Sequence, residues 1–172
     1  MSKFWHKKYV LLTGGAGFIG SRVRVMLQAY GATVITVDPR APLYSPESVN
    51  CKAEDMPLLG NLIDESDYVI HMAATVAGIQ VNSRSHAEMF KKNLIPTFSV
   101  LDACADAGKK VLLVSSACVY PESATFNMDE LHGHYDQPEA SNQGYGWAKR
   151  MGEKYAEWLA AERGLRYAVV RP

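Results

Sequence analysis

Cysteine is scarce in this sequence, long apolar runs are missing, and neither sign of charge is in excess. The three cysteines among 172 residues are an odd number and form no Cys-x-x-Cys pair. A disulfide framework, a cysteine-rich zinc site and a thioredoxin-type redox motif are therefore disfavoured. No apolar segment approaches the roughly 20 residues that span a bilayer, and the first residues lack the apolar stretch of a signal peptide. We expect a cytoplasmic protein with no membrane partner.

The charged residues balance, with 18 basic and 18 acidic side chains and a formal net charge of zero. A neutral chain lacks the broad electrostatic attraction that binds nucleic acid, so no nucleic-acid partner is expected. His132 and His134 are close together in the sequence, but no third ligand accompanies them, and an exposed polar loop is the preferred interpretation. We therefore predict no metal site.

What the sequence does contain is an alternation of short β-branched runs and longer amphipathic segments, which is typical of a parallel sheet covered by helices. Strands are expected at residues 9–13, 33–38, 48–53, 68–73, 110–115 and 166–170, and helices at 20–30, 56–65, 85–107 and 145–163. Pro96 predicts a kink or a late start in the third helix, and residues 121–142 are expected to form a loop. The pattern predicts one α/β domain over residues 1–172, with a doubly wound parallel sheet of the Rossmann type.

Gly14, Gly17 and Gly20 follow the first expected strand and open the first expected helix. A tight turn whose backbone approaches a phosphate requires residues without a Cβ. The free N–H groups and the dipole of the helix N-terminus then attract a pyrophosphate. Because the glycines lie between a strand and a helix, residues 13–20 predict dinucleotide binding more strongly than three glycines alone would.

Asp38 ends the second expected strand, 18 residues after Gly20. A carboxylate at this place accepts hydrogen bonds from the adenosine ribose and repels a 2′-phosphate, which favours NAD(H) over NADP(H). Arg40 leaves NADP(H) open as the alternative, since a nearby arginine can accommodate that phosphate. We expect NAD as the cofactor.

Tyr145 and Lys149 lie four residues apart on the last expected helix, so their side chains share one face. A tyrosine with its ordinary pKa of about 10 is a poor base, and we expect the lysine and a bound nicotinamide to lower that pKa. Ser115 and Ser116 end a strand at the edge of the sheet where ligands bind, and either could polarise a substrate C–O group. Together these residues predict a site for hydride transfer coupled to proton transfer.

Several segments resemble the extended short-chain dehydrogenase/reductase superfamily of nucleotide-sugar epimerases and dehydratases. They are residues 13–20, 71–74, 115–120, 145–149 and 171–172, together with Asn93. The resemblance implies an NAD-dependent enzyme, a nucleotide-sugar substrate, and a homodimer formed by helices 85–107 and 145–163. It also implies a smaller C-terminal substrate region, which we expect to be absent or truncated because the sequence ends at Pro172.

The same resemblance implies roles for individual residues. Ser116 falls at the position of the catalytic serine, with Tyr145 as acid or base and Lys149 as its partner. The implied cofactor contacts, besides Tyr145 and Lys149, are Gly14, Gly17, Phe18, Ile19, Gly20, Asp38, Asp55, Met56, Ala73, Ala74, Thr75 and Asn93. The implied substrate contacts are Gly78, Ile79 and Ser116. For Asn93, securing the helix before Pro96 is an equally supported alternative.

Residues 117 and 118 indicate which members of the superfamily the chain resembles most. Dehydratases of this superfamily carry an Asp-Glu pair where this chain has Ala117 and Cys118, which counts against dehydration. Residues 116–121 instead resemble the Ser-x-Cys-Ile/Val-Tyr-Pro stretch of GDP-mannose 3,5-epimerases and GDP-fucose synthases, whose cysteine is an acid and base beside a transient ketone. A thiol with an ordinary pKa of about 8.5 can exchange such a proton if its site lowers that pKa modestly. A small buried cysteine that fills the strand end is the alternative.

GDP-fucose synthases use NADPH, whereas Asp38 points to NAD. The sequence therefore favours an epimerase that oxidises a nucleotide sugar, exchanges an α-proton at Cys118 and re-reduces the ketone with a retained cofactor. A keto-sugar reductase or another short-chain oxidoreductase, and a dinucleotide-sensing protein without catalysis, are the alternatives. Without its substrate region, the chain is expected to bind NAD and to turn over little.

Overall fold

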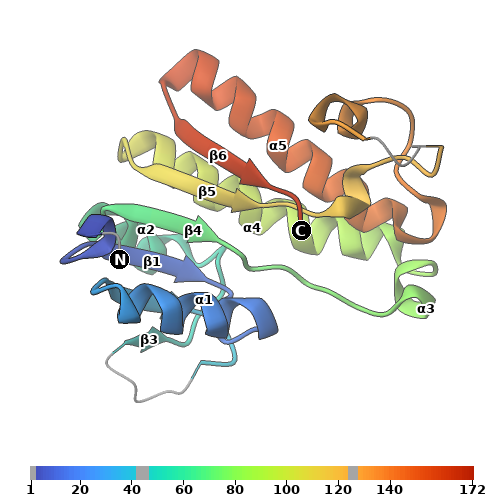
Figure 1. The fold of residues 1–172 in the computed structure, drawn as a ribbon. Coiled ribbons are helices and arrows are strands. Elements are labelled where there is room, and N and C mark those ends of the chain that lie inside the picture. Colours follow the sequence, from blue (N-terminus) through green and yellow to red (C-terminus); the bar gives the residue numbers. More distant parts are fainter. Residues whose placement is uncertain (1–2, 42–46, 124–127) are drawn as a thin grey trace.

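The computed structural model describes residues 3–41, 47–123 and 128–172, with the side chain of Met56 left out (Figure 1). Within these residues one parallel sheet has the strand order β3-β2-β1-β4-β5-β6. The strands are β1 (Tyr9–Thr13), β2 (Thr33–Val37), β3 (Ser48–Val49), β4 (Tyr68–His71), β5 (Lys110–Val114) and β6 (Arg166–Val170). The chain winds outward from β1 to β3, then returns past β1 and winds the other way from β4 to β6. The expected doubly wound sheet is confirmed.

Helices cover both faces of the sheet (Figure 1). Helices α2 (Met56–Glu65), α4 (His86–Asp106) and α5 (Gln143–Arg163) pack on one face, and α1 (Phe18–Ala29) packs on the other. Alternate residues of β1 serve the two layers, with Leu11 in the first core cluster and Val10 and Leu12 in the second. A strand buried on both faces is apolar throughout, which is why this run was recognisable in the sequence.

Glycines in the left-handed region of the backbone terminate helices α1 and α5. Gly31 follows α1 with φ +86°, and Gly164 ends α5 with φ +71° and donates its N–H to the Ala160 carbonyl. A left-handed residue terminates a helix at little cost only if it is glycine. Among the described residues no helix combines the length and the apolar character needed to cross a membrane.

Several expected boundaries were wrong. Helix α1 begins at Phe18 rather than at residue 20, because Gly17 is extended with ψ 174° and the helical hydrogen bonds start directly after it. A late start of α4 after Pro96 is also wrong, since the helix runs from His86 to Asp106 with the proline inside. Proline removes one N–H donor, and the packing of α4 against α5 outweighs that loss.

Short helices were also missed. Helix α3 (Ile79–Asn82) was not predicted, and the expected loop 121–142 contains the 3₁₀ helices η3 (Glu130–His134) and η4 (Ala140–Asn142). Asn82 Nδ2 donates to Asn142 Oδ1 at 2.7 Å, which holds α3 against η4. Such contacts join segments far apart in the chain, so no local pattern announces them.

Candidate active site

The carboxyl ends of β1, β4 and β5 open into a cleft of about 1210 Å³. The strand order reverses between β1 and β4, which is where open α/β sheets bind their ligands. Most residues predicted to contact a cofactor or a substrate line this cleft. They are Gly14, Gly17, Phe18, Ile19, Gly20, Asp38, Ala73, Ala74, Thr75, Ser116, Tyr145 and Lys149.

Other predicted site residues do not line the cleft. They are Asp55, Gly78, Ile79, Asn93 and Cys118, while the side chain of Met56 lies outside the described part of the chain. Asp55 is exposed at the start of α2, where its Oδ2 accepts a hydrogen bond from Lys52 N–H at 2.9 Å. Ile79 is 65% exposed on α3. Of the residues expected to contact the substrate, Gly78 and Ile79 are exposed outside the cleft, whereas Ser116 lines it.

The cleft also holds lysines that the sequence patterns did not single out. Lys52 follows β3, and Lys91 and Lys92 come from α4. Lys92 forms an ion pair with Glu88 one turn earlier in the helix. No motif surrounds these lysines, and it is the packing of α4 beside the sheet that brings them to the cleft.

Two glycines shape the loop between β1 and α1. Gly14 has φ +74°, and a Cβ there would lie 2.8 Å from the Met72 carbonyl oxygen. A Cβ at Gly20 would overlap the Gly14 carbonyl. Because α1 begins directly after the loop, the N–H groups of Phe18 and Ile19 in its first turn have no helical acceptor. A compact loop that ends in free N–H donors fits a pyrophosphate.

Asp38 joins the glycine loop to the end of β2. Its side chain is 2% exposed, and its Oδ2 accepts from Ala16 N–H at 3.2 Å. Its Oδ1 accepts from the N–H and the Nε of Arg40, at 2.9 and 3.2 Å. The carboxylate therefore engages the arginine that would otherwise be free to bind a 2′-phosphate. This arrangement fits the ribose hydroxyls of NAD.

Ser115 contributes a buried hydroxyl that the described residues leave without a partner. Its Oγ is buried, the residue lines the cleft, and its N–H is held by the Val170 carbonyl at 2.8 Å. A buried hydroxyl without a hydrogen bond is unfavourable until a ligand or water satisfies it. The unpaired Ser115 hydroxyl therefore offers a polar ligand one hydrogen bond inside the cleft. Together with the glycine loop and Asp38, it fits a polar cofactor such as NAD.

A buried histidine links the elements beneath the cleft. The hydroxyl of Thr13 accepts a backbone N–H from the segment after β4 and donates its proton to His71 Nδ1 at 2.8 Å, because the hydrogen of the neutral ring lies on Nε2. Thr97 donates its hydroxyl proton to the Asn93 carbonyl and accepts from His71 Nε2–H at 3.2 Å. Burial, helped by the Lys149 ammonium, lowers the pKa of His71 to about 3. The histidine is therefore neutral and ties β1, β4 and α4 together.

Ser116, Cys118 and Tyr145 come together at the end of β5. The Oγ of Ser116 accepts from Cys118 N–H at 3.2 Å, and the Ser116 hydroxyl is near enough to Tyr145 to lower the pKa of its phenol. Lys149 is buried, and its Nζ donates to the Val114 carbonyl at 2.9 Å. The same Nζ lies 5.7 Å from the centre of the Tyr145 ring. Ser116 and Tyr145 thus line the cleft, and Cys118 lies beside them outside its lining.

The pKa of Tyr145 is shifted in the direction opposite to the expected one. Burial raises this pKa and the nearby Cys118 thiolate raises it further, while the hydrogen bond with Ser116 opposes the shift. Burial also lowers the pKa of Lys149 to about 8, against the attraction of Glu153. At neutral pH the phenol is therefore protonated. The expected lowering by the lysine is corrected for this structure, because burial is the largest influence on the Tyr145 pKa and Lys149 is not among its causes.

Across residues 3–41, 47–123 and 128–172, no group of three or more His, Cys, Asp or Glu side chains could hold a metal ion. His132 Nδ1 lies 2.8 Å from Asp129 Oδ1, where it completes the cap of η3. His134 Nε2 lies 3.4 Å from Arg171 Nη2. Both histidines of the His-Gly-His pair are thus engaged within their own surroundings.

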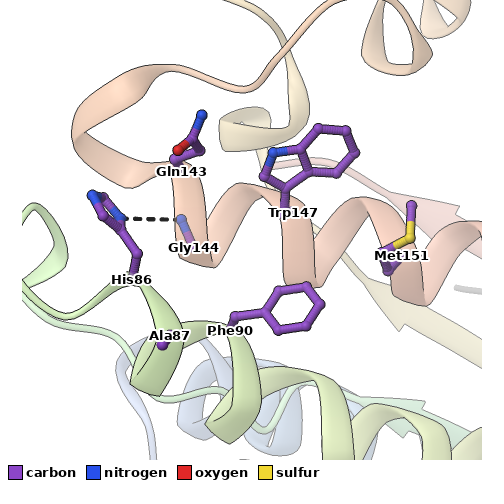
Figure 2. A pocket seen from close by; sticks show the side chains of 7 residues that line it. All are labelled: His86, Ala87, Phe90, Gln143, Gly144, Trp147 and Met151. Atoms are coloured by element: carbon purple, nitrogen blue, oxygen red, sulfur yellow. Dashed lines mark hydrogen bonds between the residues drawn. The ribbon is translucent and has the colours of Figure 1, made fainter.

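Figure 2 shows a second hollow, of about 410 Å³, between α4 and α5. Phe90 comes from α4, and Trp147 and Met151 come from α5. His86 Nδ1 accepts the N–H of Gly144 at 3.3 Å across the two helices. The hollow shares no lining residue with the cleft and is mostly apolar.

Fold and cleft together define a class, a Rossmann protein with a Tyr-x-x-x-Lys helix beside a strand-end serine. The family model described as the NAD dependent epimerase/dehydratase family matches residues 10–172. The chain belongs to this family, and NAD is its cofactor.

Individual relatives agree with this membership. The GDP-L-fucose synthase of Dictyostelium discoideum is 28% identical over 100% of this chain and 53% of its own length. The GDP-mannose 3,5-epimerase 1 of Oryza sativa subsp. indica is 25% identical over 98% of this chain and 47% of its own length. The UDP-glucose 4-epimerase of Thermus thermophilus, solved in complex with NAD, has a TM-score of 0.78 and 27% identity over 95% of this chain and 54% of its own. The chain spans about half the length of the relatives that it matches.

Proposed function

We propose that residues 1–172 form one NAD-binding domain of a nucleotide-sugar epimerase. The observation that carries this proposal is the meeting of Ser116, Cys118 and Tyr145 at the end of β5, beside a cleft built for a dinucleotide. A thiol beside a redox site gives the chain a group that can exchange a carbon-bound proton. A dinucleotide-sensing protein without catalysis does not require that group.

The cofactor would be held along the cleft. The N–H groups of Phe18 and Ile19 bind the pyrophosphate, and Asp38 accepts hydrogen bonds from the adenosine ribose. Lys149 binds the hydroxyls of the second ribose. When bound, NAD supplies the group that accepts a hydride from the sugar and later returns it.

The side chains handle the protons of the reaction. The Tyr145 phenol must first lose its own proton to solvent. The phenolate then takes the proton of a sugar hydroxyl as that carbon is oxidised, and gives it back when the ketone is reduced. Ser116 donates a hydrogen bond to the same oxygen. The Cys118 thiolate removes the proton from the neighbouring carbon, so that the C–H electron pair enters the enolate and the sulfur becomes a thiol. Return of a proton to the opposite face of that carbon requires a second acid.

The similarity to GDP-mannose 3,5-epimerase, GDP-L-fucose synthase and UDP-glucose 4-epimerase supports a nucleotide sugar as the substrate. A keto-sugar reductase is the second candidate, supported by the similarity to GDP-L-fucose synthase. Such a reductase would consume NADH in net turnover, whereas an epimerase would return its NAD unchanged after each cycle.

We also propose that the chain forms a homodimer through α4 and α5. The apolar hollow between these helices supports this, since Phe90, Trp147 and Met151 line it near the surface (Figure 2). A Phe90→Glu variant places a charge in that hollow and should yield monomers in analytical ultracentrifugation. A wild-type chain that sediments as a monomer would refute the proposed dimer.

The function is tested by incubating the chain with NAD and UDP-, GDP- and dTDP-sugars in deuterated water. Protein is used at stoichiometric concentration, so that slow turnover is visible by NMR. Tyr145→Phe should abolish deuterium incorporation while leaving NAD binding unchanged, and Cys118→Ser should abolish incorporation at the α-carbon. Tyr155→Phe is the matched control, because Tyr155 lies on the same helix and bonds Asp102 rather than a cleft residue. Incorporation that survives in Cys118→Ser would rule out the thiol as the base.

A further inference from the structure

The turn that carries Cys118 is held from several sides, by Pro172 at the edge of the cleft and by residues outside it. Its Ala117 N–H donates to the Pro172 carbonyl at 2.9 Å, and Val119 is fully buried. A Cβ at Gly146 of α5 would collide with the Cys118 carbonyl, so the helix backbone packs directly on the turn. The position of the thiol therefore depends on what fixes this turn against α5.

Arg150 of α5 forms the first set of contacts that hold this turn. The residue is 3% exposed, and its guanidinium donates to three backbone carbonyls, those of Val119, Tyr135 and Asp136. Val119 directly follows Cys118, while the other two acceptors follow η3. One arginine on the helix that also bears Tyr145 thus joins both ends of the segment after Cys118.

Arg171 forms the second set of contacts that hold this turn. Its guanidinium forms a buried ion pair with Glu153 of α5, at 2.6 and 3.0 Å, with side-chain exposures of 10% and 5%. It also donates to the Tyr120 hydroxyl at 3.1 Å and to the Glu130 carbonyl at 2.7 Å. The same guanidinium lies over the Tyr120 ring, 5.1 Å from its centre. Charged hydrogen bonds in such a buried place hold geometry more strongly than surface pairs do.

We propose that Arg150 and the Glu153–Arg171 pair are positioning residues that clamp the Cys118 turn against Tyr145. Glu153 lies two turns after Tyr145 on α5, so the clamp and the phenol share one rigid helix. The catalytic importance of the clamp rests on the proposed acid–base role of Cys118. The effect of the clamp on the position of the thiol is independent of that role.

The three cysteines of the chain provide separate reporters for this proposal. Cys118 reports on the clamped turn, and half-buried Cys51 follows β3 at the other end of the sheet. Cys104 is 0% exposed in the core of α4, so it reacts only when the whole domain opens. Alkylation by iodoacetamide, followed at each cysteine by mass spectrometry, measures all three rates in one sample.

Arg150→Lys is the decisive variant, since a single ammonium keeps the charge but cannot reach carbonyls at both ends of the segment. We expect the Cys118 rate, relative to that of Cys51, to rise about tenfold, as for the loss of one charged hydrogen bond. Arg163→Lys is the matched control on the same helix, because Arg163 pairs at the surface with Asp102 and Asp106. It should leave the ratio within about twofold of wild type.

The mild variant Tyr120→Phe covers the case in which Arg150→Lys opens the domain and Cys104 also reacts. It removes one hydrogen bond of Arg171 and keeps the ring, and the Cys118 to Cys51 ratio should still rise. The proposed clamp would be overturned if the Cys118 to Cys51 ratio stays unchanged in Tyr120→Phe and Arg150→Lys gives no specific rise either. In Arg150→Lys that means an unchanged ratio, or reaction of Cys104 as well because the whole domain opens.

A second readout separates positioning from loss of stability. In the deuterium-exchange assay, Arg150→Lys should slow α-carbon exchange while the dissociation constant for NAD stays unchanged. If α-carbon exchange and NAD affinity fall by the same factor, Arg150 contributes to overall stability and the proposal is overturned. Exchange that persists in Cys118→Ser would instead refute the proposed function, and the alkylation ratio would still decide the clamp.

Discussion

Asn93 holds both backbone polar groups of Thr75. Its Oδ1 accepts the Thr75 N–H at 2.9 Å, and its Nδ2 donates to the Thr75 carbonyl at 3.0 Å. Thr75 lines the cleft, whereas Asn93 is 3% exposed behind it. Nδ2 also donates to the Met89 carbonyl within α4 at 2.8 Å. The amide therefore reaches the cofactor site through the backbone that it holds, and not by lining the cleft itself.

Replacing Asn93 with alanine should weaken NAD binding because the Thr75 backbone loses both of its fixed partners. We expect the dissociation constant to rise about tenfold, equivalent to about 1.4 kcal/mol. Isothermal titration calorimetry with NAD measures this change. Asn61→Ala, on the exposed side of α2, is the control and should bind like wild type. Equal affinities of all three proteins would contradict the role given to Asn93.

The Asp38–Arg40 pair should decide between the two dinucleotides. In Asp38→Ser the ribose loses a charged acceptor, while the Arg40 guanidinium is released from the carboxylate. We expect NAD to bind about tenfold more weakly and NADP about tenfold more tightly. Asp64→Asn, on the exposed surface of α2, is the control. A double variant that also carries Arg40→Ala should lose the gain for NADP, and a gain that persists would exclude Arg40 as its cause.

Gly20 and Gly60 make a matched pair of helical glycines. A Cβ at Gly20 overlaps the Gly14 carbonyl, whereas a Cβ at Gly60 meets nothing within 4 Å. Gly20→Ala should displace the loop and abolish measurable NAD binding. Gly60→Ala should raise the free energy of unfolding by about 0.5 to 1 kcal/mol and leave NAD binding unchanged. Urea unfolding and calorimetry test both; tight NAD binding by Gly20→Ala would refute the compact-loop interpretation.

Buried His71 should make the chain less stable as the pH falls below about 6.5. Its folded pKa is about 3, below the ordinary value of 6.5, so between these values the unfolded chain binds a proton that the folded chain lacks. The free energy of unfolding should therefore fall by about 2 kcal/mol from pH 7 to pH 5. Carboxyl groups contribute chiefly below pH ~4.5.

Urea unfolding of His71→Asn at pH 7, 6 and 5 tests this assignment. The variant should be less stable at pH 7, because Thr13 and Thr97 lose a partner, yet its stability should change little with pH. His6→Asn, at an exposed position, should keep the wild-type slope. A wild-type slope in His71→Asn would assign the acid sensitivity to other groups.

Much of the fold was predictable because its signals are local. The apolar run at β1, the glycines that end α1 and α5, and the loop that opens α1 each follow from a few adjacent residues. Helix α3 was not predictable, since its four residues are too few to show a period and Asn82 is held by Asn142, 60 residues away. The unbroken course of α4 through Pro96 likewise depends on packing against α5 rather than on its own residues.

The sequence by itself determined the doubly wound fold class, the place of the dinucleotide loop, and the residue types that gather at the end of β5. Alternation of apolar and breaker residues carries that information, because strand and helix periods are local properties. The tertiary structure alone decided the state of those side chains: the raised pKa of Tyr145, the neutral His71, and the capture of Thr75 by Asn93. Burial and hydrogen-bond partners set these states, and both come from segments that only folding brings together.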